Sequence, residues 1–75
     1  MKELEPLGIV QLENIDEIFA LSDPVVEPAL RAQDAELARS AFRAVARILQ
    51  RNGYITPLLA ENFIEAAEQR TANLP

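Results

Sequence analysis

A long run of apolar residues in the middle of the chain repeats with the period of an α-helix. From Leu37 to Leu49 they recur every three or four residues, along one side of a helix, for about four turns. The run ends at Asn52-Gly53, where glycine suits the left-handed position that follows a helix. We expect a helix that begins at Pro28, or at Ala35 with Asp34 as its N-cap, and that ends near Asn52. Its apolar stripe comprises Leu37, Ala38, Ala41, Phe42, Val45, Ile48 and Leu49.

A second helix is predicted after a short connection. Thr56 is a good N-cap and Pro57 suits the first helical position, while fraying is expected between Arg70 and Asn73. The two helices, joined by residues 52–56, predict an antiparallel helical hairpin. In that hairpin we expect five side chains to be largely buried: Phe42, Val45, Leu49, Leu59 and Phe63.

The N-terminal part of the chain carries signals for short helices. Asn14 can cap a helix from about Ile15 to Leu21, with Glu17 closing a capping box. Ser22-Asp23-Pro24 indicates a stop followed by a new start, and Pro28 would break a helix that was already established. Val25 and Val26 are expected to be buried near this corner.

These signals predict an all-α fold, a small bundle of three or four helices built on a C-terminal antiparallel helical hairpin. We expect a single helical domain over residues 1–75. It divides into an acidic N-terminal segment with short helices, 1–33, and the helical hairpin, 34–75. A chain this short buries only about 60% of its unfolded surface, so stability depends on efficient packing or on a partner.

Charge is distributed unevenly along the chain. Residues 1–38 contain nine acidic and two basic residues, a balance of −7, whereas residues 39–75 contain five arginines and three glutamates, a balance of +2. An acidic half is therefore joined to a mildly basic half.

Four arginines define the candidate site, because Arg39, Arg43, Arg47 and Arg51 recur every four residues opposite the predicted core. No acid after Glu36 on this helix offsets them, and like charges at this spacing repel. Two interpretations stay open: a solvated helix face, or a docking face for a carboxylate-rich or phosphate-bearing partner. Arginine gives the docking interpretation more weight than lysine would, because its planar guanidinium binds such groups in a bidentate manner.

Catalytic and metal-binding patterns are missing. The chain contains no Cys and no His, which removes thiol catalysis, disulfides, the commonest general base and the commonest metal ligand. No glycine-rich phosphate loop or calcium loop occurs. We therefore predict a non-enzymatic protein with no catalytic residues, no cofactor and no metal.

Nucleic acid and membrane partners are disfavoured. The net charge of −5 opposes attraction to phosphate backbones and anionic lipid. Glu61, Glu65 and Glu68 lie on the outer face of the last predicted helix, where they would repel DNA phosphates. Neither a signal-peptide pattern nor the roughly 18 apolar residues of a transmembrane helix is present, so we expect a cytoplasmic protein.

The best functional prediction is a small protein-binding module that regulates or assembles a partner protein through the four arginines. The partner would be another protein, with acidic surfaces the best match. One alternative is a self-associating structural or assembly module, and a weaker one is a nucleic-acid-associated regulator. A homodimer is also predicted, because Leu4, Leu7, Ile9 and Val10 add apolar surface beyond what a small bundle easily covers.

Overall fold

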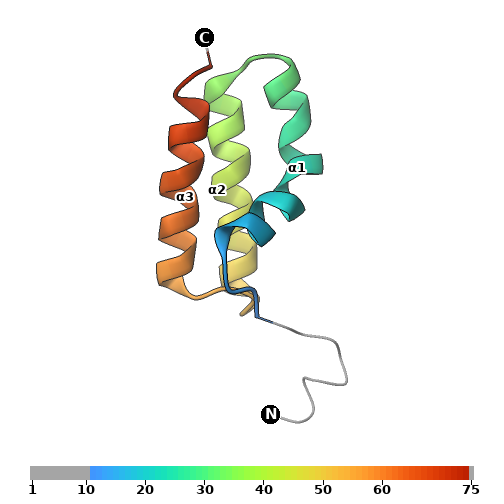
Figure 1. Ribbon diagram of the computed structural model, residues 1–75. Helices are drawn as coiled ribbons and strands as arrows, with labels where there is room; N and C mark the ends of the chain where they lie inside the picture. Colours follow the sequence, from blue (N-terminus) through green and yellow to red (C-terminus); the bar gives the residue numbers. More distant parts are fainter. Residues whose placement is uncertain (1–10, 75) are drawn as a thin grey trace.

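The computed structural model describes residues 11–74, which form three α-helices (Figure 1). Helix α1 spans Ile15–Arg31, α2 spans Ala35–Arg51 and α3 spans Pro57–Thr71. No strand occurs within residues 11–74, and the prediction of a small all-α bundle is confirmed. Helix α2 lies beside α3 and also packs against α1, and the C-terminus lies at the end of the bundle where α2 begins.

The three helices begin at the caps that the sequence indicates. Asn14, Asp34 and Thr56 each accept a hydrogen bond from the backbone N–H three residues later, at 3.1, 3.0 and 3.1 Å. Each bond satisfies one donor that the first helical turn leaves free. The predicted capping box differs in detail, because the Glu17 carboxylate accepts from the N–H of Glu13 rather than from that of Asn14.

Two helices end in the same hydrogen-bonded turn, although only one of them has glycine. After α2, Tyr54 N–H donates to the Leu49 carbonyl and Gly53 N–H to that of Gln50, with Gly53 at φ 81°. After α1 the equivalent left-handed position is held by Gln33, at φ 57°. The glycine after α2 was predicted from the sequence. The residue after α1 is a glutamine in a conformation that L-residues disfavour.

Helix α1 corrects the prediction of short helices. It runs unbroken for 17 residues through Pro24 and Pro28 and bends part-way along its length (Figure 1). Pro24 cannot donate to the carbonyl of Ala20, and this missing hydrogen bond accounts for a bend rather than a stop. The Ser22 hydroxyl, at the position where a stop was predicted, is buried inside the helix and donates to the Phe19 carbonyl at 2.9 Å.

The core is centred on three phenylalanines, one from each helix. The ring centroids of Phe19 and Phe63 lie 4.7 Å apart, and Phe42 lies 5.6 Å from Phe19 and 5.8 Å from Phe63. All three rings are buried, in the edge-to-face and tilted arrangements that aromatic rings prefer. Small residues on each helix leave room for the rings: Ala29, Ala38, Ala46, Ala60 and Ala67 are also buried.

The predicted core was partly wrong. Phe42 and Phe63 are buried, but Val45, Leu49 and Leu59 are only half-buried and pack against the edge of the core. The face of α2 that is fully covered runs through Ala38, Phe42 and Ala46, so side chains to either side of it remain accessible. Val25 also differs from the prediction, because it is 59% exposed whereas Val26 is buried.

Leu37 and Ile48 are a further correction, since both belong to the predicted core stripe. They are 54% and 55% exposed, on the same side of α2. The apolar stripe of α2 is broader than the surface that α1 and α3 cover. Two neighbouring helices bury the line of Ala38, Phe42 and Ala46, and the far margin of the stripe stays outside.

The C-terminal end of α3 is anchored by hydrogen bonds of Thr71 and by the packing of Leu74. The Thr71 hydroxyl is buried and donates to the carbonyls of Ala67 and Glu68 at 3.1 and 3.0 Å. Leu74 is half-buried, packs against the core and donates its N–H to the Thr71 carbonyl at 3.1 Å. The helix ends at Thr71, within the range 70–73 where the sequence predicts fraying, and the packing of Leu74 on the core is a contact that the local sequence does not reveal.

Candidate functional site

The candidate site is the arginine surface of α2, which we define as Arg39, Arg43, Arg47 and Arg51. A spacing of four residues exceeds one helical turn, so each arginine is rotated by about 40° from the one before it. Arg43, Arg47 and Arg51 are exposed as predicted, but Arg39 is half-buried. The rotation explains the difference, since it brings Arg39 closest to the covered line through Ala38 and Phe42.

The charges of this surface are not neutralised by nearby acids of the described chain. Within residues 11–74 the one ion pair joins Arg31 and Glu27 of α1, at 2.8 Å and with both side chains well exposed. None of the four arginines of α2 has a carboxylate partner among these residues. Exposed, unpaired guanidinium groups keep their full hydrogen-bonding capacity for an external carboxylate or phosphate.

The C-terminal half of the arginine surface borders a small depression. Arg47, Gln50 and Arg51 line this open hollow, whose volume is about 230 Å³. Two guanidinium groups and one carboxamide offer donors to a planar acidic group resting there. These three side chains bring their donor groups to one depression of the arginine surface.

The acidic residues of α3 do not form ion pairs with the arginine surface within residues 11–74. Glu61, Glu65 and Glu68 are exposed, and none of them forms an ion pair in the described part of the chain. The outer side of α3 therefore carries negative charge, next to a helix whose exposed charges are mainly positive. This arrangement opposes the approach of α3 to a phosphate backbone.

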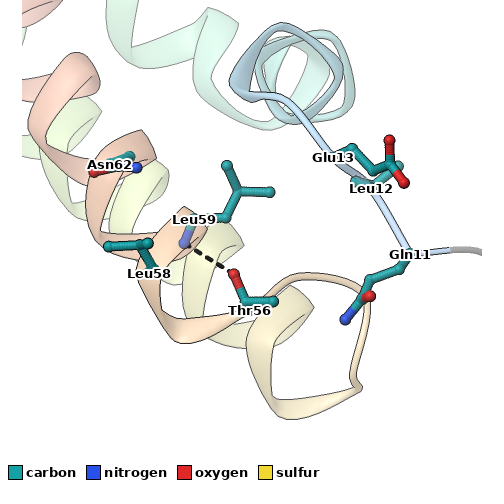
Figure 2. A pocket seen from close by; sticks show the side chains of 7 residues that line it. All are labelled: Gln11, Leu12, Glu13, Thr56, Leu58, Leu59 and Asn62. Atoms are coloured by element: carbon teal, nitrogen blue, oxygen red, sulfur yellow. Dashed lines mark hydrogen bonds between the residues drawn. The ribbon is translucent and has the colours of Figure 1, made fainter.

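A second depression joins segments that are far apart in the sequence. Figure 2 shows Gln11, Leu12 and Glu13 on one side, and Thr56, Leu58, Leu59 and Asn62 at the start of α3 on the other. Its volume is about 300 Å³, and Leu58 is 68% exposed beside it. The N–H of Leu12 donates to the Tyr54 carbonyl at 2.7 Å, which fixes the segment to the α2–α3 connection. Local sequence patterns do not indicate this depression.

The polar groups of this second depression are structural. The Thr56 hydroxyl accepts the N–H of Leu59 as the N-cap of α3 (Figure 2). Glu13 lies in the turn that precedes α1, where its N–H donates to the Glu17 carboxylate. Each bond stabilises the start of one helix, α3 or α1. Among its lining residues, the depression presents no cluster of free charged groups.

The buried hydroxyl groups of the described residues form hydrogen bonds within their own helices. The two buried hydroxyls, Ser22 and Thr71, donate to backbone carbonyls. No group of three acidic side chains in residues 11–74 is placed to hold a metal ion. None of the three helices is both long enough and apolar enough to cross a membrane.

No protein family, curated protein or solved structure matches this chain. The interpretation of the arginine surface therefore rests on its own geometry and charge.

Proposed function

We propose that this chain is a small, cytoplasmic, non-enzymatic protein-binding module that regulates or assembles a partner protein through the arginine surface. The frame is the antiparallel hairpin of α2 and α3, with α1 covering it. The partner presents a carboxylate-rich surface, which the guanidinium groups bind. The observation that carries the proposal is the exposure of Arg43, Arg47 and Arg51 without carboxylate partners among residues 11–74.

The repulsion among these arginines supports a role in binding a partner rather than in stabilising the fold. Like charges four residues apart on a helix destabilise it, and α2 contains three such pairs in succession. The arginines are not needed to solubilise a chain that already carries a net charge of −5. A partner with negative charge would turn this repulsion into a favourable interaction.

Two alternatives make different predictions. A self-associating structural module would bind a second copy and no acidic probe. A nucleic-acid-associated regulator would bind duplex DNA more tightly than an acidic peptide, but the net negative charge and the exposed Glu61, Glu65 and Glu68 oppose it. The acidic-protein proposal is therefore the one that the charge distribution favours.

The test uses a short poly-glutamate peptide and a duplex DNA of random sequence as probes, titrated into the purified chain at low salt. We expect measurable binding of poly-glutamate and weaker binding of DNA. Arg47→Gln should weaken poly-glutamate binding, whereas Arg31→Gln, which removes the same charge from α1, should change it little. Equal effects of the two substitutions would reduce the interaction to net charge and contradict a defined surface.

A further inference from the structure

The apolar stripe of α2 has an exposed margin, outside the surface that α1 and α3 cover. Leu37, Ala41, Ala44 and Ile48 are spaced by four, three and four residues, so they share one side of the helix. Leu37 and Ile48 are 54% and 55% exposed, Ala44 is exposed and Ala41 is half-buried. We call these four residues the outer seam. It adjoins the covered line of Ala38, Phe42 and Ala46, and its half-buried member Ala41 packs against the core.

The spacing of the outer seam is that of a coiled-coil interface, in which apolar residues alternate by three and four. Its order is also symmetric, because Leu37 and Ile48 lie equally far in sequence from the midpoint between Ala41 and Ala44. If two α2 helices pair in opposite directions about this midpoint, Leu37 meets Ile48 of the second copy and Ala41 meets its Ala44. Large side chains meet at the ends and small ones at the centre, where the helices can approach closely.

The charges at the two ends of α2 favour the same orientation. The helix begins with Asp34 and Glu36 and ends with Arg47 and Arg51. Antiparallel pairing places the acidic start of each copy beside the basic end of the other, at both ends of the interface. Parallel pairing would bring like charges together, and it would also align the two helix dipoles unfavourably.

We propose that the outer seam binds a second copy of this chain, through antiparallel pairing of the two α2 helices about a two-fold axis. This inference goes beyond the proposed function, although Arg47 and Arg51 also belong to the arginine surface. Pairing through one 17-residue helix per copy gives an interface about 25 Å long. An interface of that length is small, so the dimer should be reversible at micromolar concentration.

The first experiment measures the mass of the purified full chain by sedimentation equilibrium from low to high micromolar concentration. We expect a monomer–dimer equilibrium. Leu37→Gln with Ile48→Gln should raise the dissociation constant at least tenfold, and circular dichroism checks that this variant stays helical. Leu58→Gln is the matched control, since Leu58 is 68% exposed but lies on α3, and it should leave the equilibrium unchanged. A parent that is monomeric at every concentration overturns the inference, as does an equal effect of the control.

The orientation is tested by disulfide cross-linking, because the chain contains no cysteine of its own. Leu37→Cys and Ile48→Cys variants are oxidised separately and as an equal mixture. Antiparallel pairing predicts cross-linked heterodimers in the mixture, in excess of homodimers of either variant. A preference for homodimers overturns the antiparallel arrangement.

The two proposals can fail independently. The Leu37→Gln/Ile48→Gln variant keeps all four arginines, so it should bind poly-glutamate as a monomer. If the parent chain is monomeric yet binds poly-glutamate, the outer seam is not an interface and the arginine surface stands. If the dimer forms but the peptide does not bind, the reverse holds.

Discussion

The guanidinium carbon of Arg70 lies 3.7 Å from the centre of the Phe19 ring, a cation–π contact that joins the last turn of α3 to the N-terminal half of α1. The Phe19 ring in turn contacts Phe42 and Phe63, so Arg70 covers one side of the aromatic core. Few contacts link α1 directly to α3, which makes this one important for holding α1 against the pair of α2 and α3.

Replacing Arg70 should therefore destabilise the fold without affecting the arginine surface. Arg70→Gln should lower the free energy of unfolding by about 0.5–1 kcal/mol, the range of an exposed cation–π interaction, with some further loss from reduced packing over Phe19. Urea denaturation measures the effect, and Arg31→Gln, in an exposed ion pair, serves as the control. If both substitutions cost the same, the contact with Phe19 contributes nothing specific.

Truncating the central ring should nearly abolish folding. Phe63 is fully buried between Phe19 and Phe42, so Phe63→Ala removes two ring contacts and leaves a cavity. The expected cost is roughly 3–5 kcal/mol, which is comparable to the whole stability of so small a domain. Leu58→Ala should cost far less, because that side chain is 68% exposed. A Phe63→Ala chain that melts like the parent would contradict the described core.

Substitutions at the two residues with left-handed backbone conformations should change the stability of the fold in opposite directions. Gln33 at φ 57° is strained, so Gln33→Gly should stabilise the fold by about 1 kcal/mol. Gly53 at φ 81° has no neighbouring atom within 4 Å of an added Cβ, so Gly53→Ala should cost about 1 kcal/mol through the backbone alone. Thermal melts of the two variants check both signs, and a loss of stability in Gln33→Gly would show that its side chain has a role of its own.

Much of this fold could be predicted from local signals, because caps and turns depend on neighbouring residues. Asn14, Asp34, Thr56 and Gly53 hold the positions that their chemistry indicates. The continuity of α1 could not be predicted in this way. Proline penalises a helix locally, but burial of Ile18 and Val26 on either side of Pro24 outweighs that penalty.

The candidate site could also be predicted only in part from the sequence. The exposure of Arg43, Arg47 and Arg51 follows from their spacing relative to the apolar stripe, whereas the half-burial of Arg39 depends on which part of α2 its neighbours cover. The outer seam could not be predicted for the same reason. Periodicity gives the width of an apolar face but not how much of that face a neighbouring helix buries. The contact of Arg70 with Phe19 involves residues remote in sequence, and no local pattern indicates it. The predicted apolar contribution of Leu4, Leu7, Ile9 and Val10 lies outside the described residues.

The arginine surface should be dispensable for folding. Arg43→Gln with Arg47→Gln removes two exposed side chains and relieves all three like-charge pairs on α2. The free energy of unfolding should rise by a few tenths of a kcal/mol, roughly 0.5. Thermal and urea melts measure the change, and a loss of several kcal/mol would show that the arginines are structural.

The proposed docking role of the arginine surface is tested by measuring poly-glutamate binding to the parent chain and to the Arg43→Gln/Arg47→Gln variant at two salt concentrations. We expect the parent to bind the peptide more weakly as salt rises, because exposed charges are screened beyond about 8 Å at physiological ionic strength. At low salt the variant should bind roughly three- to tenfold more weakly than the parent. A parent that does not bind the peptide, or a variant that binds it as tightly as the parent, would contradict the assignment of the arginine surface as the docking site.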